Sequence, residues 1–310
     1  MVLYFFSGCK MFIRLFLLLY LSTTSLHLYA DASYWDSGLV RSYVHYSDLQ
    51  RRWAMSFLAP HLKSLIGDEE ILDVGCGDGK ITADISKFIP SGSIVGVDLS
   101  TAMIGWAQKQ YHHREYSNLT FQEGSFLAPN LGSFDVIVSF CALQHCSDQT
   151  EALKILSQVL KPNGKLLILV PLMNNPAWNQ ARSAVQSRPQ WADYWKNFTP
   201  RKFLSPQQYI EILEESNLEV VKVEAVQTMD SFVDREEILD WLEGTFAPVV
   251  PKDKVREFYT QWIEEYLKVD PSAISADGVI YAKLGYIGIE AIQQGVSDDA
   301  CFCKGKLLRR

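Results

Sequence analysis

A glycine-rich segment early in the chain has the residue types and spacing of a cofactor-binding loop. Gly75, Gly77 and Gly79 alternate with other residues between a predicted strand at Ile71–Val74 and a predicted helix that starts at Lys80. Glycine lets the backbone turn tightly and approach a ligand closely, and the amide groups at a helix start face that ligand. The third glycine comes one residue earlier than in the dinucleotide pattern G-x-G-x-x-G, which disfavours a nicotinamide oxidoreductase.

Two carboxylates flank this loop. Asp73 lies just before it, where its charge would repel a pyrophosphate and attract an amino group or a sulfonium. Asp98 follows the second predicted strand, Ser93–Val97, where a carboxylate can accept hydrogen bonds from both ribose hydroxyls of an adenosine. Ser100 or Thr101 can cap the next helix, so Asp98 is left for a ligand. The loop therefore predicts a positively charged, phosphate-free adenosine cofactor.

Further residues are expected to complete the cofactor site. Leu99 and Met103 would pack on the adenine. The segment after the third predicted strand is placed to meet the amino edge of the base, and the end of the fourth strand closes the site: Gly124, Ser125, Phe126 and Phe140. No C-x-x-C pair occurs, so no metal site is predicted.

Apolar strands alternate with amphipathic helices up to residue 170, which predicts a parallel sheet covered by helices on both faces. The following segment, Asn174–Leu204, is polar and without clear period, and we expect it to lie over the sheet edge. Later elements are predicted at Ser205–Ser216 (helix), Leu218–Val226 (strand), Asp234–Glu243 and Lys252–Leu267 (helices) and within Val279–Ile289 (strand). The prediction is one α/β domain at 40–292 with helical cap insertions near 174–216 and 227–270.

Composition and the two ends of the chain narrow the function classes. With 29 Lys+Arg against 36 Asp+Glu the net charge is −7, which disfavours nucleic-acid binding. Residues 1–32 are predicted to be a signal peptide or hydrophobic leader, although Met11 is an alternative start. No membrane insertion of the domain after the leader is expected. The leader favours export or membrane anchoring, whereas the five remaining cysteines favour the cytoplasm, so localisation stays open. A disordered tail is predicted at 293–310. The role of its Cys301 and Cys303 stays open, as does the oligomeric state.

Four segments together resemble the class I S-adenosylmethionine-dependent methyltransferases: Ile71–Gly79, Val95–Ser100, Phe134–Phe140 and Leu160–Lys165. The resemblance implies S-adenosyl-L-methionine as cofactor and a doubly wound seven-stranded sheet in the order 3-2-1-4-5-7-6 with the last strand antiparallel. At Tyr43–Tyr46 with Arg51 and Arg52, and again at 238–278, the chain looks like trans-aconitate and insect juvenile hormone acid methyltransferases. Both groups methylate carboxylates on small molecules. Where that family has Leu-Gln-Trp or Leu-His-Trp after the fourth strand, this chain has Leu-Gln-His ending at His145, so the pocket wall is changed.

A carboxylate acceptor is ionised at neutral pH and needs an orienting cation rather than a base. Arg51 and Arg52 are the first candidates for that cation, followed by Arg182. His145 would be a general base for a hydroxyl or amine acceptor and a hydrogen-bonding wall residue for a carboxylate. Four tryptophans are open between lining the cavity and packing: Trp178, Trp191, Trp195 and Trp241.

Two alternatives to a carboxyl methyltransferase remain open. One is a methyltransferase with a hydroxyl or amine acceptor, and the other is a non-catalytic protein that retains cofactor binding for a regulatory role. A DNA amino-methyltransferase is disfavoured, because Phe140–Leu143 is not the Asp/Asn-Pro-Pro-Tyr pattern that its chemistry uses.

Overall fold

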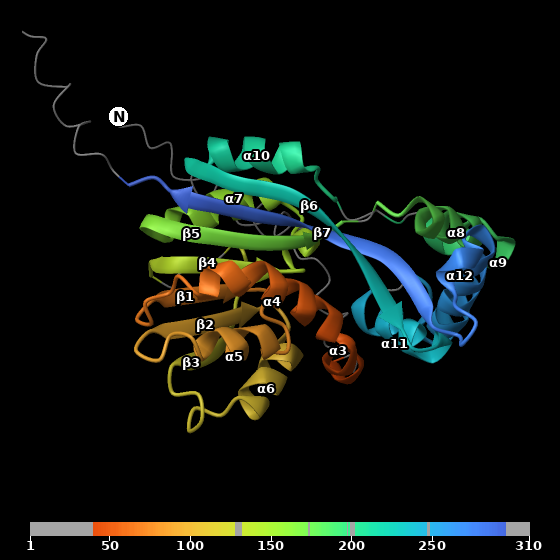
Figure 1. The fold of residues 1–310 in the computed structure, drawn as a ribbon, viewed down its shortest axis with the longest axis horizontal. Helices are drawn as coiled ribbons and strands as arrows, with labels where there is room; N and C mark the ends of the chain where they lie inside the picture. Colours follow the sequence, from red (N-terminus) through yellow and green to blue (C-terminus); the bar gives the residue numbers. More distant parts are fainter. Residues whose placement is uncertain are drawn as a thin grey trace, which may run out of the picture.

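A computed structural model describes residues 40–127, 132–172, 174–196, 198, 202–246 and 249–295. The predicted leader at 1–32 and the tail cysteines Cys301 and Cys303 lie outside the described residues. At the centre is a seven-stranded sheet in the order β3-β2-β1-β4-β5-β7-β6, which confirms the predicted topology (Figure 1). Its strands are β1 (Glu70–Val74), β2 (Ser93–Asp98), β3 (Leu119–Glu123), β4 (Phe134–Phe140), β5 (Leu160–Pro171), β6 (Leu218–Phe232) and β7 (Ile280–Gln293).

The register of the sheet brings the ends of β1, β2 and β4 together. Asp73 of β1 lies opposite Gly96 of β2 on one side and Val138 of β4 on the other, all in parallel pairs. The last strand, β7, runs antiparallel to both β5 and β6, as predicted. Because the first strands are parallel, their carboxyl ends share one edge, and the loops that follow them lie side by side there.

Helices cover both faces of the sheet because neighbouring strand residues point to opposite sides. Ile71 packs in the cluster that contains α4 (Asp48–Leu62), α5 (Lys80–Ser86) and α6 (Thr101–Gln110). Leu72 packs in the cluster on the other face, with α7 (Gln149–Gln158) and α10 (Pro206–Glu215). A short helix, α3 (Val40–Tyr46), precedes α4 and lies near the carboxyl edge of the sheet (Figure 1).

The cap is more regular than we predicted. The segment Asn174–Leu204, in which the sequence shows no clear period, contains α8 (Pro176–Gln186) and α9 (Pro189–Trp195). Asn175 caps α8 by accepting a hydrogen bond from the amide of Trp178, and a proline begins each helix. The buried positions of α8 are spaced three and four residues apart, which is a helical face that polar residues around it obscure.

Two more helices complete the cap, α11 (Arg235–Thr245) and α12 (Val255–Val269). The strand β6 continues to Phe232, beyond its predicted end, and pairs with β7 over its whole length. Figure 1 shows this long pair curving away from the sheet to reach α11 and α12, with α8 and α9 beyond them. Short 3₁₀ turns lie before and after α12, at η3 (Lys252–Lys254) and η4 (Pro271–Ala273), and another follows β4, at η2 (Leu143–His145). Within the predicted insertion at 174–216, α10 lies on the sheet beside α7 rather than in the cap.

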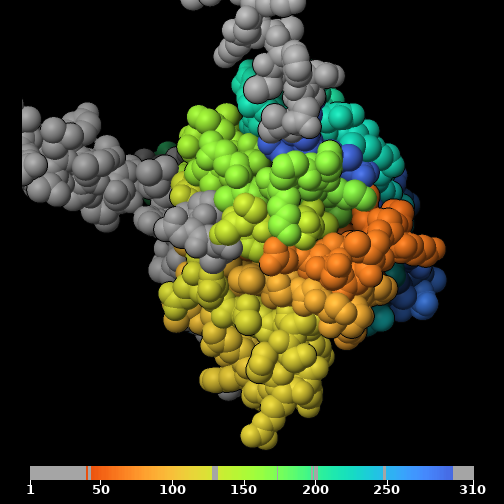
Figure 2. Space-filling view, turned by 90° about the vertical axis from the view of Figure 1, so that its left-hand side faces the viewer, coloured from red at the N-terminus to blue at the C-terminus, as the bar shows by residue number. Residues whose placement is uncertain are grey.

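Aromatic side chains fill the interior of the cap. The ring centroids of Trp178 and Trp262 are 4.8 Å apart, and Trp191 contacts Phe258 at 5.4 Å. Trp178, Trp191 and Trp241 are buried, so they pack in the cap interior. From the end opposite the cap, the surface consists mainly of the orange-to-green first half of the chain (Figure 2). Within the described ranges, no helix has both the length and the apolar character needed to cross a bilayer.

Candidate cofactor and methyl-transfer site

The glycine loop between β1 and α5 requires glycine at two places for steric reasons. Gly75 has φ +79°, and a Cβ there would lie 2.2 Å from Cβ of Ala142, the residue before η2. Gly79 also has φ +79°, and a Cβ there would lie 2.6 Å from the Phe121 ring of β3. Gly75 thus lets the loop approach the end of β4, whereas Gly79 lets α5 pack on the sheet.

Asp98 ties the end of β2 to this loop. Its Oδ2 accepts a hydrogen bond from the Gly77 amide at 3.0 Å, and its Oδ1 accepts one from the Ser100 amide at 2.9 Å. The N-cap of α6 is Ser100, whose hydroxyl accepts from the Met103 amide at 3.2 Å. The cap is therefore supplied by Ser100 as predicted, and Asp98 is held at the mouth of the loop by two backbone donors.

Asp73 is buried beneath the loop with 2% of its surface exposed. The Thr82 hydroxyl of α5 donates a hydrogen bond of 2.6 Å to its Oδ2. Burial raises the pKa of Asp73 to about 7, against the effect of this bond, and the charges of Asp98 and Asp78 raise it further. A carboxyl in this setting favours a neighbouring positive charge, which would restore its ionised form.

The remaining predicted cofactor residues differ in how exposed they are, and three of them lie in the loop after β3. Phe140 ends β4 and lines the pocket beside Gly75, and Leu99 is 37% exposed just past Asp98. Met103 and Phe126 are buried, at 3% and 8% exposure. In the loop after β3, the Gly124 amide donates to the Asp98 carbonyl at 3.0 Å and the Ser125 hydroxyl accepts from the Leu127 amide at 3.2 Å, so this loop is anchored to β2.

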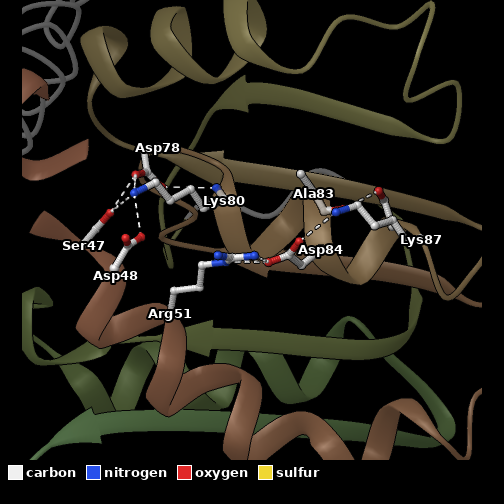
Figure 3. A network of polar contacts seen from close by, with 9 residues as sticks. Ser47, Asp48, Arg51, Asp78, Lys80, Ala83, Asp84 and Lys87 are labelled. Atoms are coloured by element: carbon white, nitrogen blue, oxygen red, sulfur yellow. Dashed lines mark hydrogen bonds and ion pairs between the residues drawn. The ribbon is translucent and has the colours of Figure 1, made fainter. Parts of the chain in front are cut away.

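A small pocket that opens to solvent lies between the glycine loop, β4 and the first helices. The residues that line it include Asp73, Gly75, Phe140 and the α4 residue Gln50. Lys80, at the start of α5, also lines it and contacts Ser47, Asp48 and Asp78 directly (Figure 3). Negative and positive side chains thus line the same pocket, and Lys80 is paired there with Asp48 and Asp78.

Of the predicted orienting residues on α4, one lines the pocket and one does not. Arg51 lines the pocket, but its guanidinium binds Asp84 at 2.6 Å (Figure 3). Arg52 lies 3.9 Å from Asp230 of β6 with 65% of its side chain exposed, and it is absent from the described pocket lining. His145 ends η2 after β4 and is partly buried, and it too lies outside the described lining.

Sequence reasoning missed Gln50 and Lys80. Gln50 is buried on the face of α4 that also buries Trp53 and Ala54, and its Oε1 has no hydrogen-bond partner. A polar residue on an otherwise apolar helix face was the available signal. Lys80 gave no such signal, because its partners at residues 44–48 are distant in sequence.

The remaining groups that could carry chemistry in this part of the molecule are its cysteine thiols and its possible metal ligands. Burial raises the pKa of the Cys76 thiol well above its usual value and that of Cys141 to about 12, so both are protonated at neutral pH. Cys76, Cys141 and Cys146 are free. Across the described ranges, no three His, Cys, Asp or Glu side chains are grouped to hold a metal ion.

Comparisons with known proteins agree with this geometry. The family described as "Methyltransferase domain" matches residues 67–217. The trans-aconitate 2-methyltransferase of Deinococcus radiodurans is 29% identical over 204 residues, covering 62% of this chain and 76% of that protein. The juvenile hormone acid O-methyltransferase of Bombyx mori is 25% identical over 241 residues, covering 72% of this chain and 82% of that protein.

Solved structures share the fold. The YcgJ protein of Bacillus subtilis superposes with a TM-score of 0.54 at 18% identity, covering 77% of this chain and 98% of that one. The sheet order, the glycine loop with its two carboxylates and the matched family lead to one conclusion. Together they support a class I S-adenosylmethionine-dependent methyltransferase with S-adenosyl-L-methionine as its cofactor.

Proposed function

We propose that this methyltransferase transfers the methyl group to a carboxylate of a small organic acid and forms a methyl ester. The observation that carries the proposal is a half-buried cation in the cap. Arg182 of α8 has no carboxylate within ion-pair distance among the described residues, and its Nε has no hydrogen-bond partner. An anionic ligand would compensate that charge.

The surroundings of Arg182 favour a carboxylate over a neutral group. Burial lowers the pKa of Arg182, and no acid opposes that shift. Its guanidinium lies 5.9 Å from the centroid of the Trp262 ring. Trp178, one turn earlier on α8, is buried with its indole N–H unpaired. Buried donors are nearly always paired, so two unpaired donors one turn apart call for an acceptor-rich group.

Most other described arginines of the cap and of α4 already lie beside acids, and Arg235, at the start of α11, is exposed. Arg188 binds Glu265 at 2.8 Å, and Arg256 binds Glu243 at 2.8 Å. Arg51 and Arg52, which the sequence placed first, bind Asp84 and Asp230. Arg182 lies outside the lining of the glycine-loop pocket, as Arg52 does, but it has no described acid partner, so it replaces them as the proposed acceptor-binding cation.

The cofactor would lie along the glycine loop. In this proposal Asp98 accepts hydrogen bonds from the ribose hydroxyls, while the backbone at Gly75 and Gly77 allows close approach. Asp73 favours the ammonium and sulfonium charges, and Leu99 and Met103 flank the adenine. A Cβ at Gly75 would clash with Ala142, so the loop is held close to the end of β4, where the proposal places the cofactor.

The bound cofactor supplies an electrophilic methyl group on sulfur. A lone pair of the acceptor carboxylate forms the new O–CH₃ bond, and the electrons of the broken S–CH₃ bond stay on sulfur as a neutral thioether. No proton moves, because the carboxylate is already ionised at neutral pH. The protein therefore has to align the two groups and exclude water, and alignment can contribute roughly 7–11 kcal/mol to the barrier reduction.

Two of the similar proteins support a carboxylate by name, since one is called a trans-aconitate and one a juvenile hormone acid methyltransferase. The test is to incubate the purified protein with methyl-labelled S-adenosylmethionine and matched acids, alcohols and amines. We expect base-labile label in the acids alone. Label in alcohols or amines would instead favour His145 as a general base, and no label in any of them would favour the non-catalytic alternative.

The variant Arg182→Met tests the cation directly. Loss of a hydrogen bond to a charged group should raise the acceptor KM by at least about tenfold and leave the cofactor KM unchanged. Arg188→Met is the matched control, because it removes an arginine from the same cap that already has an acid partner. Equal effects of the two variants would contradict the proposed role of Arg182.

A further inference from the structure

The short helix α3 (Val40–Tyr46) contacts both the cofactor loop and the cap. The Tyr43 ring of α3 lies against Gly77, where a Cβ would be 3.5 Å from it, and Tyr43 lines the cofactor pocket. At the end of the same helix, the Tyr46 hydroxyl reaches Asp240 of α11. Figure 1 shows α3 between the carboxyl edge of the sheet and α11.

Lys80 holds the loop side of this helix. Its ammonium group donates to the Val44 carbonyl, to Ser47 Oγ at 3.0 Å and to Asp48 Oδ1 at 3.1 Å (Figure 3). An ammonium group has three N–H donors, so these contacts at the α3–α4 junction use all of them. The Ser47 hydroxyl also donates to Asp78 of the glycine loop at 2.9 Å. The α3–α4 junction is therefore bonded directly to the glycine loop.

Asp240 holds the cap side. The Tyr46 hydroxyl donates to its Oδ2 at 2.5 Å, and this bond raises the pKa of Tyr46 to about 12, so the hydroxyl stays a donor. Arg256 of α12 binds Asp240 together with Glu243 at 2.8 Å and Glu236 at 2.5 Å. Asp240 is thus held in place by an arginine that joins α11 to α12.

An isolated helix of two turns is unstable in water, so the position of α3 depends on these contacts. We propose that Tyr46 and Asp240 are positioning residues whose hydrogen bond keeps α3 closed over the bound cofactor, so that cap and cofactor pocket open together. Release of the cofactor then requires this bond to break. The inference depends on cofactor binding alone and is independent of which acceptor the enzyme uses.

The test compares Tyr46→Phe with the wild-type full-length chain. Removing a hydrogen bond to a carboxylate should raise the open fraction of α3 about tenfold. Amide hydrogen exchange at residues 40–47 should become faster by about that factor, and so should the dissociation rate of S-adenosylhomocysteine. Tyr266→Phe is the control, because it removes a hydroxyl that bonds to the Tyr281 carbonyl inside the cap, away from α3.

A second variant shows whether both residues act through one bond. Asp240→Ala alone should speed dissociation as Tyr46→Phe does, and adding Tyr46→Phe to it should change the rate less than twofold, because the two residues share one bond. Unchanged exchange at α3 in Tyr46→Phe would overturn the proposal. Faster exchange with an unaltered dissociation rate would overturn it as well, since α3 would then not control release, and so would additive effects in the double variant.

Discussion

Asp73 is a buried carboxyl whose charge is unfavourable in the folded protein without its cofactor. Its pKa is about 7 against a usual value of 3.8. At about 1.4 kcal/mol for each pKa unit, the ionised form costs the folded state about 4 kcal/mol. Asp73→Asn removes the charge and keeps an oxygen that can accept from Thr82. We expect the variant to be more stable than the wild type by up to about 4 kcal/mol at pH 8.

The gain should depend on pH in a defined way. Below about pH 4 the carboxyl is neutral in both the folded and the unfolded chain, so the two proteins should be equally stable. Between about pH 4 and 7 the unfolded chain loses this proton first, so rising pH destabilises the wild type relative to the variant. Above pH 7 Asp73 is charged in both states, and the difference should reach a plateau.

The same substitution should weaken cofactor binding. A positively charged ligand stabilises the ionised form of Asp73, so wild-type affinity for S-adenosylmethionine should rise with pH up to about 7. Asparagine cannot provide this charge, and we expect an affinity loss of about 10- to 100-fold from a lost charge-assisted hydrogen bond. The variant should also lose the pH dependence that Asp73 contributes.

Urea denaturation of both apo proteins at pH 4.5, 6 and 8 measures the stability difference, and calorimetry measures cofactor binding. Asp135→Asn is the matched control, because the Glu70 amide and Lys161 lower the pKa of this carboxyl. That variant should lose a little stability at neutral pH and none in acid. A gain for Asp73→Asn that does not grow between pH 4.5 and 8, or a loss at pH 8, would refute the reasoning.

Two further substitutions test the glycine loop and its second carboxylate. Asp98→Ala should weaken cofactor binding by about 1–3 kcal/mol in calorimetry, because it removes a charged acceptor. If the variant has a normal circular dichroism spectrum and an unchanged dissociation constant, ribose binding by Asp98 is excluded. Gly75→Ala should lower the free energy of unfolding by about 1–3 kcal/mol through strain and the contact with Ala142, whereas Gly105→Ala, in α6 with open space around it, should raise it by about 0.5–1 kcal/mol. Equal effects of the two alanines in urea denaturation would show that the loop is not sterically constrained.

Elements with a strong local pattern were predictable from the sequence. The strand β4 has the predicted bounds Phe134–Phe140, and the sheet order follows the motif resemblance. The helices α8 and α9 were missed because their buried residues are few and separated by polar ones. The last six residues of β6 were missed because every second side chain there is exposed and the segment extends beyond the main sheet. Its strand conformation depends on pairing with β7.

The sequence by itself determined the central strands, the glycine loop and the nature of the cofactor, since apolar runs and glycine spacing are local properties of the chain. Only the tertiary structure decided which charged groups have partners. Arg52 meets Asp230, Arg182 meets no described acid, and Tyr46 reaches Asp240 across 194 residues of chain. Such pairs depend on how the cap folds back over the sheet. A charged residue looks the same in the sequence whether or not the fold places an opposite charge beside it.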